Sequence, residues 1–320
     1  MDDRKKIVVI GGPTCSGKTE ISTKLAENLP FEIVNFDSLC FYKYFDIGSA
    51  KPEKPLFLKT RHHLFDIKMP DEDYNAFDYS KDASFIIDDI LSRGKFPLLV
   101  GGTGLYAKAV IYGLAQIPKT DKGDIRKALF NSIETTGLKG LYEKLKTVDP
   151  LYASNISGND RVRIIRALEV YNSTGVPFSS YLNSHLFRNP KYNFINIILV
   201  PQKDILKQKI KERTLSILKK GLVEETSNII KMGYFADLKP FKGVGYKEAV
   251  MYITGEIKTE EELYEKVVKA TIQYSKRQLT WFKRSARAVF VDPADADNRQ
   301  DISSIAEYLY GFLWEKKEYF

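Results

Sequence analysis

Eight consecutive residues near the start of the chain follow the pattern G-x-x-x-x-G-K-[ST]. They are Gly12, Pro13, Thr14, Cys15, Ser16, Gly17, Lys18 and Thr19. Backbone N–H groups in such a loop turn inward around phosphate oxygens, at the positive end of the dipole of the following helix. Lys18 would add a positive charge on the phosphate, and the Thr19 hydroxyl would be a ligand for Mg²⁺. The pattern therefore predicts a phosphate-binding loop with Mg²⁺ as cofactor.

One carboxylate near this loop has a position that suits chemistry. A kinase or NTPase needs an acid at the end of a second strand to hold Mg²⁺, but the apolar run 98–100 ends in Gly-Gly-Thr, and the acid at a strand end near the loop is Asp37. Ligands of open α/β sheets bind at this carboxyl edge. Asp37 could hold a metal, accept a proton from an acceptor substrate, or cap a helix.

Basic residues gather in two later segments. Arg163 and Arg166 share a helix face, and residues 276–284 mix lysines and arginines with Gln278 and Trp281. Both segments suit a nucleic-acid backbone with an unstacked base nearby, although each on its own is more typical of a solvated helix face. The whole chain carries 49 Lys+Arg against 41 Asp+Glu, a formal charge of +8, so a polyanionic partner must be considered.

The elements that would position these residues alternate between short apolar strands and helices. Strands are predicted at 7–10, 31–36, 96–100 and 195–200, and a helix at 18–28. This order predicts an α/β fold, a P-loop NTPase-like parallel sheet flanked by helices. Residues 121–189 read as helices without strands, which predicts an inserted all-helical subdomain, with 1–120 plus 190–320 as the catalytic core and its C-terminal helices.

The composition indicates the general class of the protein and its cellular location. The chain has 320 residues and 43% hydrophobic residues, enough for a substantial core. Its two cysteines lack the spacing of a zinc site or a disulfide framework, and no apolar run is long enough to span a membrane. We therefore expect a cytoplasmic protein with no membrane association.

Taken together, the motifs resemble those of one family, the tRNA dimethylallyltransferases, also called tRNA isopentenyltransferases. The resemblance runs almost end to end. It rests on residues 12–19, Asp37-Ser38, residues 46–52, His62-His63-Leu64 with Asp66, residues 101–106, residues 166–171, Gly243-Val-Gly-Tyr-Lys-Glu248 and Lys276-Arg-Gln-Leu-Thr-Trp281. The order and number of these motifs together are very specific, although only the first is a strong motif by itself.

The resemblance implies transfer of a dimethylallyl group from dimethylallyl diphosphate to N6 of the adenosine just 3′ of the tRNA anticodon (adenosine 37). The products would be N6-dimethylallyladenosine and diphosphate. The phosphate loop would then hold a prenyl diphosphate, which would explain the missing second magnesium acid. An ATP-dependent small-molecule or nucleotide kinase and an NTP-gated RNA-binding protein are the alternatives, and both predict tight ATP binding.

The resemblance also implies roles for individual residues. Asp37 would orient the target amine and accept its proton, Thr103 would lie between the diphosphate and the target nucleotide, and Arg213 would bind the diphosphate. The partner would be the anticodon stem-loop of tRNA, and the enzyme is expected to be a monomer. The implied tRNA-binding residues are Asp37, Ser38, Leu39, Cys40, Thr103, Arg126, Val162, Arg163, Ile164, Ile165, Arg166, Lys242, Gly243, Val244, Gly245, Tyr246, Lys247, Lys276, Arg277, Gln278, Trp281 and Lys283.

The chain departs from the family pattern at one informative position. Many members carry Asp-Ser-x-Gln after the second strand, whereas this chain has Cys40 where the glutamine stands. A thiol hydrogen-bonds only weakly, so recognition of the bases beside the target should differ here. Ser49 in place of the more common threonine is a mild change.

Overall fold

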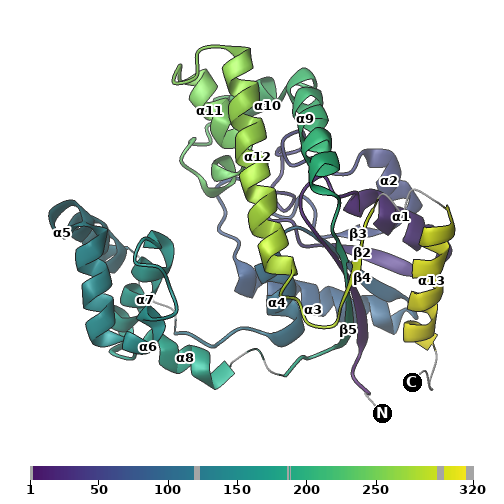
Figure 1. The fold of residues 1–320 in the computed structure, drawn as a ribbon, viewed down its shortest axis with the longest axis horizontal. Helices are drawn as coiled ribbons and strands as arrows, with labels where there is room; N and C mark the ends of the chain where they lie inside the picture. Colours follow the sequence, from purple (N-terminus) through teal and green to yellow (C-terminus); the bar gives the residue numbers. More distant parts are fainter. Residues whose placement is uncertain (1–2, 119–122, 186, 188, 294–298, 315–320) are drawn as a thin grey trace. The chain divides into compact units, whose positions relative to one another are not determined.

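The chain folds into two compact units. The structure is a computed structural model that describes residues 3–118, 123–185, 187, 189–293 and 299–314. Unit 1 comprises Met1–Ile111 together with Lys191–Phe320, and unit 2 comprises Tyr112–Pro190. Figure 1 shows the ribbon of both units, coloured along the sequence.

A parallel sheet forms the centre of unit 1. Its strands within the described residues are β1 (Lys6–Gly11), β2 (Phe31–Asn35), β3 (His62–His63), β4 (Phe96–Gly101), β5 (Asn193–Leu199) and β6 (Ala288–Val291). They follow the order β3-β2-β4-β1-β5-β6, and every pairing is parallel. β1, β2, β4 and β5 are almost entirely buried, as expected for a parallel sheet covered on both faces. The predicted α/β fold is confirmed.

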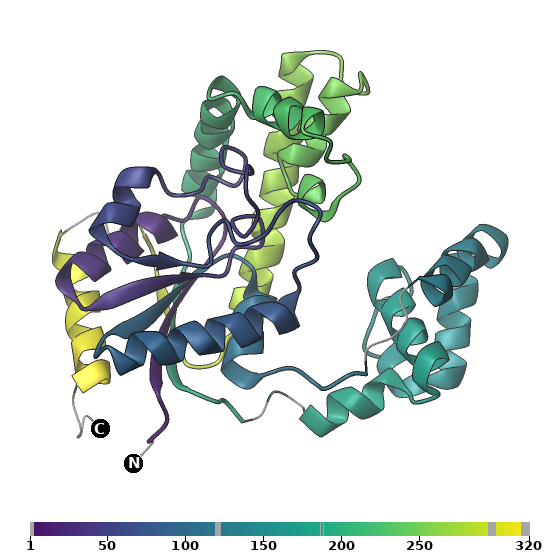
Figure 2. The same cartoon turned by 180° about the vertical axis from the view of Figure 1, so that it is seen from behind.

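Helices cover both faces of this sheet. On one face, α1 (Lys18–Asn28) and α13 (Arg299–Trp314) pack their apolar residues on alternate strand residues such as Val8, Ile10 and Leu98. On the other face lies α3 (Ala76–Ser92), which contacts β2 and β4 and is joined to α4 (Gly104–Tyr112) by a hydrogen bond from its Ser80 hydroxyl (Figure 2). The predicted helix at residues 18–28 is confirmed with the same bounds.

The register of the strands brings three functional segments to one edge. Gly11 of β1 pairs with Gly101 of β4, and Asn35 of β2 pairs with Val100. Because the strands are parallel, the phosphate loop after β1, the Asp37 turn after β2 and the Gly-Gly-Thr segment after β4 leave the sheet side by side.

The later part of unit 1 is helical and contributes to the same edge. It contains α9 (Lys203–Lys219), α10 (Leu222–Lys231), the 3₁₀ turn η1 (Lys239–Lys242), α11 (Tyr246–Ile253) and α12 (Glu260–Phe282), and the shorter α2 (Lys54–Lys59) precedes β3. α9 packs along α12 through Leu206, Ile210 and Val268. Two strands, β3 and β6, were not predicted from the sequence.

Unit 2 is a small helical bundle with its own core. Its elements are α5 (Asp124–Val148), α6 (Pro150–Ala153), α7 (Arg161–Thr174) and α8 (Phe178–His185). Helical geometry within α5 is interrupted at Gly137, whose φ is 70°. Leu145, Ile164 and Leu168 are among the buried residues of the core. None of the helices in the described ranges of either unit is long and apolar enough to cross a membrane.

A buried carboxylate joins two helix N-termini of unit 2, and its removal should be costly. Asp149 is 1% exposed; its Oδ1 accepts from Tyr152 N of α6 at 3.0 Å and its Oδ2 accepts from Ser179 N of α8 at 2.8 Å. We expect Asp149→Ala to lower the free energy of unfolding of unit 2 by about 1–4 kcal/mol, because each lost cap costs up to about 2 kcal/mol.

Hydrogen exchange of the Tyr152 and Ser179 amides under native conditions measures this loss. Asp204→Ala is the matched control, because Asp204 lies in the first turn of α9 and its side chain is 91% exposed. It should change stability by less than about 0.5 kcal/mol. Equal protection of the two amides in both variants would contradict the predicted role of Asp149.

Candidate active site

The phosphate loop runs from the end of β1 to the start of α1. Gly17 caps α1 with a φ of 83°, a left-handed conformation that glycine adopts without steric cost. The Ser16 hydroxyl is buried, 1% exposed, and is without a hydrogen-bond partner among the described residues. A buried hydroxyl is normally satisfied, so its orphaned state at a helix N-terminus fits a ligand with acceptor oxygens.

Lys18 is held within the same loop. Its Nζ donates to the backbone oxygens of Gly12 at 3.1 Å and Pro13 at 2.6 Å. Burial lowers the pKa of Lys18 to about 8; the Asp37 carboxylate opposes this shift and the Arg213 guanidinium adds to it. A bound anion would stabilise the charged ammonium and raise this pKa again.

Arg213 reaches the loop from α9. Its Nη1 donates to Thr14 Oγ1 at 2.8 Å, and its Nη2 donates to Ser49 O at 3.5 Å. The side chain is half-buried. Two cations from different elements, Lys18 and Arg213, therefore face one loop, an arrangement suited to a diphosphate.

Asp37 lies in a tight turn after β2. Its Oδ1 accepts from Leu39 N at 3.2 Å, and the buried Asn35 fixes the turn by accepting from Asp37 N at 2.8 Å. No helix begins after Asp37 in this described segment, so the helix-cap interpretation is wrong and the carboxylate closes a turn instead. Thr103 Oγ1 accepts from Ser38 N at 3.3 Å, which joins this turn to the segment after β4.

Two cavities of unit 1 meet at these residues. One, of about 320 Å³, is lined by the phosphate loop and by Cys40. The other, of about 350 Å³, has an apolar wall that includes Ile210, Ile217 and Val267 of α9 and α12. The residues that line both are Thr14, Asp37, Ser49 and Arg213. We call the first cavity the anion chamber, because Lys18 and Arg213 line it, and the Asp37 carboxylate lies at the junction where the two cavities share their lining.

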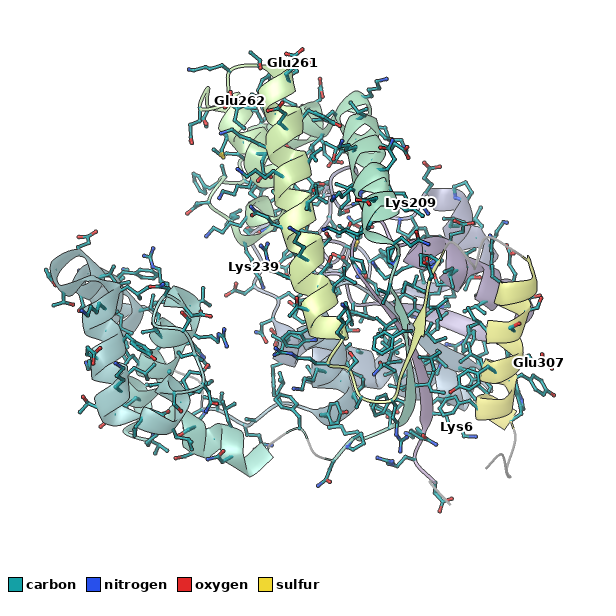
Figure 3. All side chains as sticks on the ribbon, in the orientation of Figure 1. Lys6, Lys209, Lys239, Glu261, Glu262 and Glu307 are labelled. Carbon is teal, nitrogen blue, oxygen red and sulfur yellow. The ribbon has the colours of Figure 1, made fainter. Side chains whose placement is uncertain are left out.

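Three basic side chains line the second cavity. Lys239, Lys242 and Arg277 line it, and Lys239 is labelled in Figure 3. The acidic residues of the first turn of α12, Glu261 and Glu262, lie at the opposite end of that helix (Figure 3). The acidic first turn of α12 therefore lies away from the cavity, whereas Arg277, near the other end of the helix, lines it.

The RNA-contact residues implied by the resemblance separate into three groups by exposure. Seven are half-buried: Asp37, Ser38, Leu39, Thr103, Arg166, Gly243 and Val244. Eight have exposed side chains or lie at the surface: Arg126, Val162, Arg163, Lys242, Lys247, Lys276, Arg277 and Lys283. Trp281 is 43% exposed. Six are buried: Cys40, Ile164, Ile165, Gly245, Tyr246 and Gln278. The side chains of five of these residues are packed inside the protein, Gly245 has none, and Cys40 lines the cavity at the phosphate loop; a role for the six in RNA contact stays a prediction.

Two arginines of α7 in unit 2 are held by acidic neighbours. Arg163 Nε donates to Asp160 Oδ2 at 2.6 Å, and Arg166 Nη1 donates to the buried Glu169 at 3.2 Å. The exposed Arg161 guanidinium lies over the Phe130 ring at 4.8 Å. Unit 2 thus carries pre-positioned guanidinium groups on one short helix.

Sequence reasoning missed a carboxylate that braces the site. Glu225 of α10 accepts from the backbone N–H groups of Asp46, Ile47 and Gly48, and also from Tyr246 Oη at 2.6 Å. This network fixes the loop whose next residue, Ser49, accepts from Arg213. The sequence signal for this network is the motif around Tyr246, because the hydroxyl of that tyrosine hydrogen-bonds with Glu225 and with Gly48 N.

Comparison with known proteins gives consistent matches. The IPP transferase family model matches residues 40–285 of the chain. A tRNA dimethylallyltransferase of Geobacter sulfurreducens is 41% identical over 309 residues, 96% of this chain and 98% of that protein. The crystal structure of the full-length tRNA isopentenylpyrophosphate transferase of Bacillus halodurans has a TM-score of 0.71 at 35% identity and covers 96% of both chains.

A further solved structure extends the likeness to eukaryotes. A eukaryotic dimethylallyltransferase, described as acting on tRNA, has a TM-score of 0.82 at 26% identity over 98% of this chain and 81% of that one. The matches with this relative and with the solved structures cover nearly the whole chain, whereas the family model covers residues 40–285. The chain belongs to the IPP transferase family, together with these tRNA dimethylallyltransferases.

Proposed function

We propose that this protein transfers a dimethylallyl group from dimethylallyl diphosphate to N6 of the adenosine 3′-adjacent to the anticodon of tRNA. The observation that carries the proposal is the junction of the two cavities, where Asp37 faces the anion chamber formed by Lys18 and Arg213. A carboxylate at that point suits proton transfer beside a diphosphate leaving group. Family membership and the likeness to tRNA dimethylallyltransferases support the same reading.

In the donor half of the reaction, the dimethylallyl group separates from the diphosphate. As the bond between the allylic carbon and oxygen breaks, the electron pair goes to the diphosphate, which gains negative charge. Lys18, Arg213 and the loop's N–H groups bind that charge more strongly in the transition state than in the substrate, so they lower the barrier. Ser16 supplies a further donor, and its hydroxyl is then satisfied.

The chamber could hold Mg²⁺ through the Thr19 hydroxyl and the bound diphosphate. The described residues hold no group of three or more His, Cys, Asp or Glu side chains that could hold a metal ion. Thr19 and Asp37 line the chamber, so an ion here would rest on the Thr19 hydroxyl and on diphosphate oxygens, the hard ligands that Mg²⁺ prefers. When bound, Mg²⁺ would neutralise part of the leaving-group charge.

The acceptor half requires a base, because the exocyclic amine of adenine is a poor nucleophile. The Asp37 Oδ1 atom is occupied by Leu39 N, and Gly102 lies beside Oδ2. In the proposal, Oδ2 orients the amine toward the allylic carbon and accepts its proton as the nitrogen–carbon bond forms. The apolar wall near Ile210 and Ile217 holds the dimethylallyl group and keeps water from the developing cation.

Binding of RNA is assigned to the exposed basic groups. Lys242, Arg277 and Lys283 of unit 1 and Arg163 of unit 2 are exposed. The target base must leave its stack to reach Asp37, as base-modifying enzymes require. The formal charge of +8 would then favour binding of the negatively charged tRNA backbone.

Alkylation of Cys15 tests the donor assignment. Cys15 is half-buried and lines the anion chamber, whereas Cys40 is 5% exposed and burial raises the pKa of its thiol. We expect N-ethylmaleimide to modify Cys15, and dimethylallyl diphosphate at ten times its Kd to slow the reaction about tenfold, because only the free protein reacts.

Peptide mass spectrometry measures the modification, and Cys15→Ala is the control that should remain unlabelled in the native state. ATP at the same concentration should protect far less, since the chamber is assigned to a prenyl diphosphate. Protection by ATP alone would favour the kinase alternative.

A further inference from the structure

Gln278 of α12 is inserted between the phosphate loop and the segment after β4. Its side chain is 5% exposed. Its Oε1 accepts from Thr14 N at 2.8 Å, and its Nε2 donates to Gly102 O at 3.0 Å. A carboxamide is suited to this position because it can accept from one backbone segment and donate to another at the same time.

The sequence accommodates this contact with a glycine. A Cβ atom at Gly102 would lie 2.3 Å from Gln278 Nε2, much closer than any real contact. The glycine therefore lets α12 approach the strand end closely enough for the carboxamide to bridge both segments. The contact with Gln278 therefore explains why the Gly-Gly-Thr segment has a glycine at position 102, without reference to any ligand.

The two segments that Gln278 joins belong to opposite halves of the site. Thr14 also accepts from Arg213 through its hydroxyl, which places it in the donor half. Gly102 precedes Thr103, whose hydroxyl holds the turn of the acceptor half at Ser38. One turn earlier on α12, Tyr274 lines the larger cavity.

We propose that Gln278 is a positioning residue that fixes the separation between the diphosphate loop and the acceptor turn. This inference rests on the proposed prenyl transfer and gives Gln278 a task other than RNA contact. Reacting atoms must be held about 3–3.5 Å apart, and a displacement of about 1 Å can cost about 10²-fold in rate. A buried bridge between the two halves controls that distance directly.

The test compares Gln278→Met, which keeps the length of the side chain but makes neither hydrogen bond, with Gln273→Met. Gln273 is exposed on the same helix, so its variant is a matched control. We expect Gln278→Met to lower kcat about 10²-fold and to weaken binding of inorganic diphosphate, while the Kd for tRNA stays within about twofold. Gln273→Met should resemble the wild type in all three measurements.

Gln278→Glu supplies a readout that a purely structural role would not move. A protonated carboxyl reproduces both hydrogen bonds, whereas the carboxylate repels the oxygen of Gly102. The activity of this variant relative to wild type should therefore rise as the pH is lowered. This ratio also decides the matter if Gln278→Met does not fold, which circular dichroism shows.

Three outcomes would overturn the inference. They are a kcat of Gln278→Met within threefold of wild type, a loss confined to tRNA affinity, and a pH-independent activity ratio for Gln278→Glu. Failure of the proposed function looks different: wild type and Gln273→Met would both transfer no dimethylallyl group. In that case, binding of inorganic diphosphate by Gln278→Met and wild type still tests the bridge.

Discussion

Replacing Asp37 by asparagine should lower the rate of dimethylallyl transfer by about 10²–10⁴-fold, the usual contribution of a positioned general base. Asparagine can still accept from Leu39 N and close the turn after β2, so the backbone should keep its course. It cannot accept the proton that the adenine amine must lose. Single-turnover transfer with both substrates saturating measures the loss.

The Asp37→Asn variant should bind tRNA and inorganic diphosphate as the wild type does. Asp71→Asn is the control, since Asp71 is an exposed carboxylate outside both cavities. A tRNA Kd that rises in step with the loss of rate would show that Asp37 serves binding or folding instead of proton transfer.

Replacing Lys18 by methionine should reduce kcat/KM by about 10²–10³-fold, as removal of one donor from a developing oxyanion does. The ammonium of Lys18 faces the same chamber as Arg213, and its partners among the described residues are the backbone oxygens of Gly12 and Pro13. A diphosphate offers a stronger, charged acceptor. Methionine retains most of the length of the side chain and removes the charge.

Lys18 also predicts a pH dependence of diphosphate binding. Its pKa in the free protein is about 8 because burial disfavours the charged form. A bound anion raises the pKa, so affinity is complete below about pH 8 and weakens up to about tenfold per pH unit above it. Titration with inorganic diphosphate should show this slope in the wild type and not in Lys18→Met. A flat wild-type profile through that range would exclude contact between Lys18 and the ligand.

The phosphate loop was readable from sequence because its chemistry is local. Eight adjacent residues place backbone donors, a lysine and a threonine around one anion, and α1 begins at Lys18 as predicted. Asp37 was found for a related reason, since parallel strands deliver their carboxyl ends to the same edge, whereas Thr103 was predicted only through the family resemblance. The sheet follows from buried apolar runs, which are strong in β1, β4 and β5.

Other features depend on packing between distant segments and had no clear local signal. β6 carries Val289 and Phe290 at its exposed edge, and β3 has two residues, so neither shows the periodicity of a buried strand. Gln278 stands in a basic segment that suits RNA, yet it is buried against Gly102 from a position 176 residues away. The charged residues in the sequence identify the exposed face of α12, but they do not show what the buried face of this helix contacts.

Transfer of labelled dimethylallyl to tRNA in the absence of any nucleotide tests the central claim most directly. Purified protein, Mg²⁺, tRNA and dimethylallyl diphosphate carrying the label in the allyl group are mixed, and the modified nucleoside is identified after digestion. We expect label on N6 of the adenosine 3′ of the anticodon, with one diphosphate released for each group transferred. Unlabelled tRNA under these conditions, together with consumption of ATP when it is supplied, would contradict it.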